Sequence, residues 1–426
     1  MNTRSWLFIL LLLLVSLSGC FVFQRNNASV STQSKSNASD FSAMYNPSAS
    51  VVNPQLVAYV SSESEADVFF RIQTRELRNA LANPIENEIN LYVRYFLRDA
   101  SDFHIVDTTS LVYAFNVSQG EYVYGHFKVG INEKIRYKLV VDFANSHYNV
   151  RKRLLCDIKN TQDFNDGKYL LKNLSGEVLF TNVIKPGQDV LVVAGSQCAE
   201  SIDVEFYELS KYVNLPPYLS SPVKTQNVPD SLFSYRFGDT LHLDASGFYA
   251  LGSTAKNEKF GIVVTENASY PSITTVADMV DPMNLICTER EFARIDTSDN
   301  RKKSVDAFWL GLSGSEKNAK EQIRVFYNRV AMANMMFASR VEGWKTDRGM
   351  IYVMLGPPSV VNITPDSEEW SYGSGTQSIV FTFENYSGLK NDFSLLRSNT
   401  YSSIWQQVLN TWRSGKIFTV SKLNNE

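Results

Sequence analysis

Alternation of apolar and polar residues dominates the chain between residues 56 and 160. Such alternation predicts strands with one buried face and one exposed face. Its clearest runs are residues 88–97, 122–127 and 135–143. Turn-forming pairs such as Gln119-Gly120 and Asn145-Ser146 separate neighbouring runs. Regularly spaced short strands of this kind are typical of a sandwich or barrel, so we expect a β-sandwich domain over residues 56–160.

A second region of strand pattern follows, and we expect a second β-sandwich-like domain over residues 165–265. A long connection interrupts it, beginning at Pro216-Pro217 and continuing through a polar stretch to about residue 230. Its predicted strands are residues 176–180, 189–193, 202–207, 241–243 and 260–264.

Near residue 280 the spacing of apolar residues changes from that of a strand to that of a helix. Residues 284–294 and 303–312 predict two helices, and a longer helix is expected from Glu316 to about Glu342. Its start carries a capping pattern, Ser313 followed three residues later by Glu316, and Gly343 is placed to end it in the left-handed conformation. One apolar stripe runs along this helix, formed by Ala319, Ile323, Phe326, Val330, Ala333 and Phe337.

Short strands and one more helix complete the C-terminal pattern. The predicted strands are residues 350–355, 369–372, 379–383 and 393–396, and the helix is 402–413. Pro357-Pro358 is expected to stop the first strand, since proline cannot donate to a ladder. The predicted fold class is therefore multidomain and β-rich, with two N-terminal β-sandwich-like domains and a C-terminal α+β domain over residues 270–426.

The N-terminus has the order of a secretory signal. Arg4 precedes an apolar run over residues 6–17, and small residues follow in Leu17-Ser18-Gly19-Cys20. The run is shorter than the roughly 20 residues that span a bilayer. We therefore predict a signal peptide over residues 1–19. Residues 20–55 are rich in Ser and Asn, and this composition predicts a flexible tether.

Leu17-Ser18-Gly19-Cys20 resembles the lipobox of bacterial lipoproteins. The resemblance implies a diacylglycerol on the Cys20 thiol and an acyl chain on its new N-terminus, which gives membrane anchoring without any other cofactor. A plain signal peptide with an incidental cysteine is the alternative. In Bacteroidetes-type lipoproteins, surface export accompanies acidic residues soon after the cysteine. Here the first is Asp40, so the resemblance favours the periplasmic face of the outer membrane.

Composition and cysteine usage narrow the function classes. The 426 residues hold 41 basic and 44 acidic side chains, and loss of Arg4 with the signal leaves a net charge of −4. This balance, without a dense Lys/Arg cluster, argues against nucleic acid as a partner. Cys156 and Cys198 could form one disulfide, or they could remain buried free thiols. The four histidines are widely scattered and no paired Cys/His spacing occurs, so we predict no metal site.

The segment Gly343-Trp344-Lys345-Thr346-Asp347-Arg348-Gly349 resembles the GWxTD domain family. That family is known from secreted and lipid-anchored bacterial proteins, many of them from Bacteroidetes, and it implies no established activity. The resemblance covers about residues 270–415. Further segments that fit are Phe308-Trp309, 329–334, Gly356-Pro357-Pro358 and Trp370-Ser-Tyr372.

Each residue of this segment has an expected structural task. Trp344 can anchor the turn in the core, and Thr346 and Asp347 can accept bonds from nearby backbone N–H groups. Arg348 can pair with Glu368 or Glu369. The structural motif, which is also a candidate interaction surface, comprises Gly343, Trp344, Thr346, Asp347, Arg348, Gly349 and Trp370.

Three functions are compatible with these patterns. The first is a non-catalytic scaffold or accessory subunit of an envelope complex of the assembly, secretion or gliding type. The second is a glycan-binding module with aromatic platforms among Tyr122, Tyr124, Trp344 and Trp370. The third is a hydrolase in which Asp347 is a general acid or base, although such a carboxylate usually needs a second positioned group. The sequence favours the first, a protein that is not an enzyme.

Overall fold

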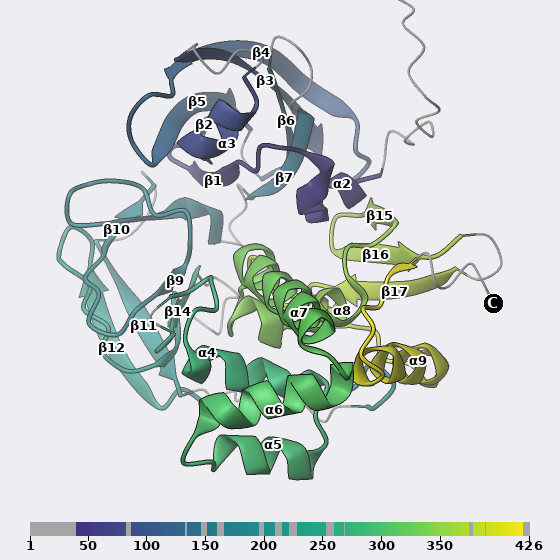
Figure 1. Cartoon of the computed structure of the whole chain (residues 1–426). Helices are drawn as coiled ribbons and strands as arrows, with labels where there is room; N and C mark the ends of the chain where they lie inside the picture. Colours follow the sequence, from purple (N-terminus) through teal and green to yellow (C-terminus); the bar gives the residue numbers. More distant parts are fainter. Residues whose placement is uncertain are drawn as a thin grey trace, which may run out of the picture. The chain divides into compact units, whose positions relative to one another are not determined.

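The computed structural model describes residues between 40 and 420, with short gaps (Figure 1). The predicted signal peptide, Cys20, Cys198 and His147 lie outside the described residues. Within the described ranges, no helix is both long enough and apolar enough to cross a bilayer. These ranges are 40–81, 87–132, 134–145, 151–159, 166–195, 200–208, 215–220, 228–252, 260–267, 269–374, 378–387 and 389–420.

Seven antiparallel strands form two sheets in the first β region. One has the order β1-β2-β5 and the other the order β4-β3-β6-β7. Side chains from both sheets, including Phe70, Leu91 and Phe143, belong to one hydrophobic cluster. The strands are β1 (Gln55–Val60), β2 (Glu65–Gln73), β3 (Glu88–Asp99), β4 (Ile105–Asn116), β5 (Tyr122–Gly130), β6 (Arg136–Asn145) and β7 (Arg151–Lys159), with helix α3 (Thr74–Asn79) after β2.

The second β region contains a two-stranded sheet, β10-β8, and a five-stranded sheet, β12-β11-β13-β14-β9. The prediction of a strand over residues 176–180 is wrong. The backbone turns there, with the N–H of Gly176 bonded to the carbonyl of Asn173, and Val178 makes only an isolated bridge. The elements are η2 (Asp166–Lys168), β8 (Tyr169–Lys172), β9 (Val183–Ile184), β10 (Leu191–Ala194), β11 (Ser201–Tyr207), β12 (Ser231–Arg236), β13 (Gly247–Leu251) and β14 (Phe260–Val264).

The C-terminal region combines helices with one antiparallel sheet of order β15-β16-β17-β18. Its helices are α4 (Val276–Val280), η4 (Asp281–Leu285), α5 (Glu289–Asp296), α6 (Arg301–Ser313), α7 (Glu316–Phe337), η5 (Gly343–Lys345), α8 (Asp347–Leu355), η7 (Asn399–Tyr401) and α9 (Ser402–Arg413). Its strands are β15 (Val360–Ile363), β16 (Ser367–Tyr372), β17 (Ile379–Glu384) and β18 (Ser394–Leu395).

Residues 350–355, predicted to be a strand, form most of helix α8. Every side chain from Arg348 to Leu355 is buried. A continuous apolar run that is buried all round shows no period, so its pattern cannot distinguish a strand from a helix. Pro357-Pro358 therefore follows a helix rather than a strand.

The long helix α7 also differs from its prediction at both ends. Its cap is Ser315, which accepts the N–H of Asn318, rather than Ser313. It ends at Phe337, where Ala338 turns extended, and Gly343 does not adopt the left-handed conformation. The predicted apolar stripe is nevertheless the buried side of the helix.

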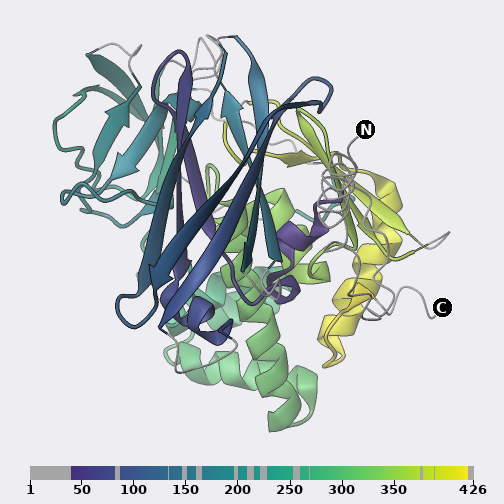
Figure 2. The same ribbon diagram turned by 90° about the horizontal axis from the view of Figure 1, so that it is seen from above.

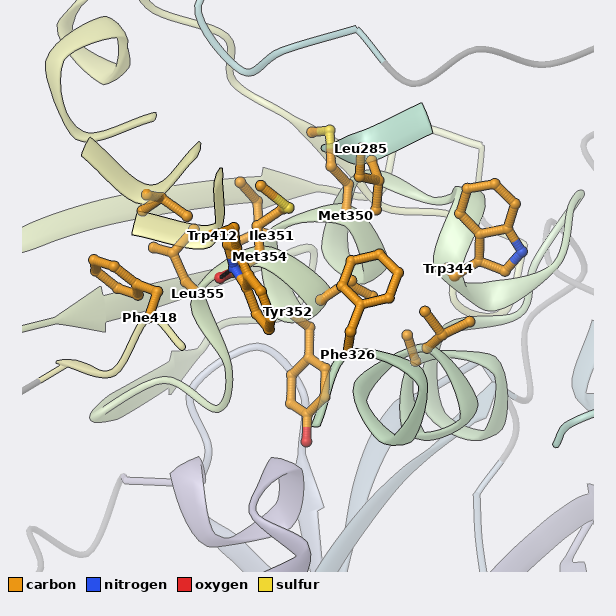
Figure 3. Close-up of a cluster of buried hydrophobic side chains, with 14 of the residues drawn as sticks. Leu285, Phe326, Trp344, Met350, Ile351, Tyr352, Met354, Leu355, Trp412 and Phe418 are labelled. Atoms are coloured by element: carbon orange, nitrogen blue, oxygen red, sulfur yellow. Dashed lines mark hydrogen bonds between the residues drawn. The ribbon is translucent and has the colours of Figure 1, made fainter. Parts of the chain in front are cut away.

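Helices α7, α8 and α9 enclose the largest core together with the C-terminal sheet. Figure 3 shows Phe326, Tyr352 and Trp412 converging within it. Helix α9 lies beside the sheet (Figures 1 and 2). Tyr401 of η7, directly before α9, stacks on Phe381 with 4.6 Å between ring centroids. The indole N–H of Trp412 donates to the carbonyl of Met354 at 2.9 Å, which ties α9 to α8.

The predicted flexible tether does not extend to residue 55. Helix α2 (Ser42–Tyr45) and η1 (Pro47–Ala49) lie inside it, and Phe41 and Tyr45 belong to the C-terminal core. The N–H of Phe41 donates to the carbonyl of Val361 in β15 at 2.9 Å. The composition of this stretch gave no indication that Phe41 and Tyr45 anchor it, because their partners lie about three hundred residues away along the chain.

Lys152 of β7 holds the same segment from the first β region. Its Nζ donates to the carbonyls of Ala43 at 2.8 Å, Met44 at 3.2 Å and Asn46 at 3.3 Å. Burial of the ammonium group lowers the pKa of Lys152 from 10.5 to about 8, opposed by the charge of Glu76.

Lys152→Met is expected to remove a pH dependence of stability. Between about pH 8 and 10.5 the unfolded chain binds more protons at Lys152 than the folded chain does, so the wild-type free energy of unfolding rises with pH there. The rise is at most about 3 kcal/mol. Urea unfolding of both proteins at several pH values measures it, and a wild-type-minus-variant difference that stays constant with pH would contradict the assignment.

Candidate functional site

The turn between α7 and α8 is packed backbone against backbone. A Cβ on Gly343 would lie 2.0 Å from the carbonyl oxygen of Ala333 in α7. A Cβ on Gly349 would lie 1.9 Å from the carbonyl oxygen of Gly343. Real Cβ atoms do not approach other atoms so closely. Both glycines are therefore required for close approach of the turn to its two helices.

Thr346 connects these two glycines. Its Oγ1 donates to the carbonyl of Gly343 at 2.8 Å and accepts the N–H of Gly349 at 3.0 Å. The second bond satisfies an N–H group of the first turn of α8, the ordinary role of a threonine N-cap. The predicted bonding of Thr346 to nearby backbone is confirmed.

Trp344 is only 6% exposed and lies on the opposite side of the labelled cluster from Trp412 (Figure 3). Its backbone N–H donates to the Asn334 side-chain oxygen at 3.2 Å. The Asn334 amide in turn donates to the carbonyl of Pro271 at 3.1 Å. The turn is thus joined through α7 to the segment that enters the helical region.

Arg348 lies in a buried charge network at the start of α8. It is 2% exposed, and its Nη1 lies 2.8 Å from Oε1 of Glu368, which is 5% exposed. Its Nη2 donates to the carbonyl of Asn391 at 3.1 Å, and its guanidinium carbon lies 4.1 Å from the Phe393 ring centroid. The predicted pairing of Arg348 with Glu368 is confirmed, and the pair lies in the core.

Two further donors complete the environment of Glu368. The Tyr45 hydroxyl lies 2.9 Å from Oε2, and the indole N–H of Trp370 donates to the same oxygen at 3.0 Å. Burial, reinforced by the Glu368 charge, raises the pKa of Tyr45 well above its usual value. Tyr352, whose ring points toward the α2 segment in Figure 3, donates to the carbonyl of Tyr45 at 3.0 Å. Sequence reasoning missed Tyr45, since nothing in its local pattern indicates a distant carboxylate.

Asp347 joins a different set of segments. Its Oδ2 accepts the N–H of Leu395 at 2.9 Å, and its Oδ1 lies 2.5 Å from Nη2 of Arg397. Arg397 also donates to the carbonyls of Leu215 at 2.9 Å and Pro216 at 2.8 Å. The expectation that Asp347 bonds within its own turn is wrong. One of its oxygens accepts from Leu395 in β18, and the other accepts from Arg397, two residues after that strand.

Burial raises the pKa of Asp347, and the positive charge of Arg397 opposes that rise. The Asp347 side chain is 12% exposed and that of Arg397 is 14% exposed. Such an arrangement can fix the relative positions of α8, β18 and the connection at residue 215. It offers substrate no open carboxylate oxygen.

The two cysteines among the described residues are half-buried. Cys156 and Cys287 are free thiols, and burial raises the pKa of each to about 12. Among the described residues, no cluster of three His, Cys, Asp or Glu side chains could hold a metal ion.

The aromatic platforms proposed for a glycan fall into two groups. Trp344 and Trp370 are 6% and 0% exposed, so their selection as exposed platforms is wrong. Each is a core residue of the C-terminal region. Tyr124 is 56% exposed and Tyr122 is half-buried, both on β5.

Residues 247–414 match the family model of the GWxTD domain. The match begins in β13, earlier than the expected start at residue 270, and it supports the predicted domain family. No curated protein matches the chain.

Solved structures give only weak likenesses. Bacteroides uniformis β-glucuronidase 2 is 9% identical, with 33% of this chain and 15% of that chain covered and a TM-score of 0.18. A β-glucuronidase from glycoside hydrolase family 2 is 19% identical over 25% of this chain and 11% of that chain, with a TM-score of 0.18. Red sea bream transglutaminase is 10% identical over 50% of this chain and 31% of that chain, with a TM-score of 0.19. The chain spans less than a third of the length of each of these proteins.

Proposed function

We propose that this protein is a lipid-anchored lipoprotein of the Bacteroidetes type, on the periplasmic face of the outer membrane. It acts there as a non-catalytic scaffold or accessory subunit of an envelope complex. The lipobox-like Leu17-Ser18-Gly19-Cys20 supports the anchor. The scaffold role rests on one observation: both charged side chains of the motif are engaged in contacts that join distant parts of the chain.

These two contacts lead from the first turn of α8 to different parts of the chain. Asp347 reaches the connection at residue 215 through Arg397. Arg348 reaches α2 through Glu368 and Tyr45. A turn that holds an N-terminal segment, a C-terminal sheet and the second β region together suits a protein whose task is to present surfaces in a set arrangement. On this proposal the two N-terminal β regions are sandwiches that supply those surfaces.

Fixation of residue 40 to the folded unit also limits the reach of a lipid anchor. About 20 residues separate Cys20 from Asp40, and an extended chain spans at most about 3.6 Å per residue. A scaffold anchored in this way works within about 70 Å of the membrane surface.

Crosslinking in intact cells tests the proposal directly. The native protein is crosslinked, purified in mild detergent and analysed by mass spectrometry. We expect an outer-membrane barrel or secretion component to co-purify, and Cys20→Ala to abolish that recovery because its lipid attachment site is gone. Recovery of the protein alone, or an unchanged partner set for Cys20→Ala, would contradict the scaffold role.

Membrane fractionation separates the anchor from the scaffold. Cys20→Ala is expected to move the protein from the membrane pellet to the soluble fraction, since two or more acyl chains provide stable attachment. Cys287→Ala serves as the matched control and is expected to stay in the pellet. Pelleting of Cys20→Ala at the wild-type level would rule out the lipid anchor.

A further inference from the structure

The three-stranded sheet has a second face that its core does not use. Along β2, Ala66, Val68, Phe70 and Ile72 belong to the hydrophobic cluster. Alternate side chains on a strand point to opposite faces, so Phe69, Arg71 and Gln73 point outward. Opposite them on β5 are His126, Tyr124 and Tyr122. We refer to this set, with Gln55 and Tyr59 of β1, as the outer face.

Aromatic rings are arranged in a row on the outer face. Phe69 stacks on His126, with ring centroids 4.5 Å apart and an interplanar angle of 25°. It also stacks on Tyr59, with ring centroids 6.5 Å apart and an interplanar angle of 21°. In the next row Tyr124, 56% exposed, lies 6.3 Å from both Tyr122 and Phe180. The rows follow β2 over about 20 Å, from Asp67 to Gln73. Tyr124 is exposed and Tyr59, Phe69, Tyr122 and Phe180 are half-buried, so parts of successive rings are open to stacking against flat ligand faces.

Arg71 lies among these rings with its charge uncompensated. Its guanidinium carbon is 4.4 Å from the Tyr122 ring centroid and 4.9 Å from that of Phe180. Its Nε donates to the Gln55 side-chain oxygen at 2.6 Å. Across the part of the chain that the structure describes, no carboxylate pairs with it. Rings and amide hold the guanidinium in place, and its Nη groups remain available to an anion.

A shallow depression of about 240 Å³ adjoins the Tyr122 end of the outer face. Arg75 and Arg78 line it, and each binds a neutral acceptor: the Gln73 side-chain oxygen at 2.7 Å and the carbonyl of Val117 at 2.6 Å. Thr74 also lines the depression. Thr74 is 2% exposed, and its Oγ1 has no hydrogen-bond partner among the described residues. This enclosed oxygen is therefore not one of the groups that the depression offers to a ligand.

We propose that the outer face and its depression bind an acidic oligosaccharide. Sugar rings present apolar faces to aromatic rings, while their hydroxyls need hydrogen-bonding side chains nearby. The face supplies both, since His126 is one of the stacked rings and its Nε2 lies 2.6 Å from Oδ1 of Asp67. Guanidinium groups bind carboxylates strongly and directionally; Arg71 supplies one on the face, and Arg75 and Arg78 line the adjoining depression. Glu121 lines the same depression and limits how much negative charge it accepts.

This inference goes beyond the scaffold role and does not depend on the lipid anchor. The test is titration calorimetry of the full chain in mild detergent with oligogalacturonate. We expect saturable binding, and binding at least about tenfold weaker to the methyl-esterified oligosaccharide, in which the carboxylate charges are removed. Tyr124→Ala is expected to weaken binding about tenfold by removing an exposed ring.

Two further variants make the result specific. Arg71→Met keeps the aliphatic stem, and it is expected to abolish most of the preference for the free acid. Tyr92→Ala removes a tyrosine that is 44% exposed on β3, in the other sheet, and should leave affinity within about twofold of wild type. Circular dichroism confirms that each variant is folded.

Several outcomes would overturn the proposal. Absence of binding, or equal loss with Tyr124→Ala and Tyr92→Ala, would rule out the outer face as the site. Equal affinity for the methyl ester would rule out an acidic ligand. Equal competition by polyglutamate would show that charge alone drives the binding and that the aromatic row has no part in it.

Discussion

Replacing Glu368 with alanine is expected to lower the free energy of unfolding by about 3–5 kcal/mol. The substitution leaves Arg348 as a charge that is 2% exposed and has lost its carboxylate. It also removes the acceptor of the Tyr45 hydroxyl and the Trp370 indole N–H. Each buried donor left unpaired adds a desolvation penalty, so the loss should exceed that of an ordinary ion pair.

Urea unfolding followed by tryptophan fluorescence measures this loss, and the same strand provides the control. Glu369 is exposed and points away from the network, so Glu369→Ala should change the free energy of unfolding by no more than about 0.5 kcal/mol. Tyr45→Phe removes one hydrogen bond and is expected to cost about 1 kcal/mol. If Glu368→Ala and Glu369→Ala unfold at the same urea concentration, the buried network does not stabilise the fold.

A double substitution separates the cost of a buried charge from the value of the pair. Arg348→Met combined with Glu368→Gln removes both charges and keeps the side-chain volumes similar. The double variant should lose less free energy of unfolding than the sum of its two single variants, because neither partner is left charged and alone. Additive losses would mean that the two side chains act independently.

Local patterns predicted most of the elements because their causes are local. The alternation in residues 88–97 comes from a strand with one face in the core, and β3 covers it. The stripe of α7 and the helix α9 likewise reflect periods within one element. Pairing of Arg348 with Glu368 could also be predicted from the sequence, since a charged residue beside a core motif requires an opposite charge.

The missed features depend on partners far along the chain. Helix α8 is buried on all sides, and only the surrounding helices and sheet make it so. Tyr45 lies in a polar stretch and finds its carboxylate 323 positions later. Asp347 bonds to Leu395 and Arg397 rather than to its own turn. In each case tertiary packing decides the local structure, and the residues that pack together do not lie within one short stretch of sequence.

The tight turn around Gly343 gives the second large expected effect. Gly343→Ala and Gly349→Ala should each lower the free energy of unfolding by about 3 kcal/mol or more. The added Cβ would lie 2.0 Å or 1.9 Å from a backbone carbonyl oxygen, and backbone cannot move aside as a flexible side chain can. Overpacking that forces backbone shifts reaches or exceeds this cost. Thermal and urea unfolding of the purified variants measure the loss, with soluble yield as a first indication.

Gly311 in α6 provides the matched control, because its Cβ position has nothing within 4 Å. Gly311→Ala should leave the fold intact and add up to about 1 kcal/mol, the helix preference of alanine over glycine. A loss at residues 343 and 349 together with a gain at residue 311 would show that close backbone contact makes the motif's glycines necessary. Wild-type stability of Gly343→Ala would instead mean that α7 and the turn can separate, and the motif would then be no rigid junction.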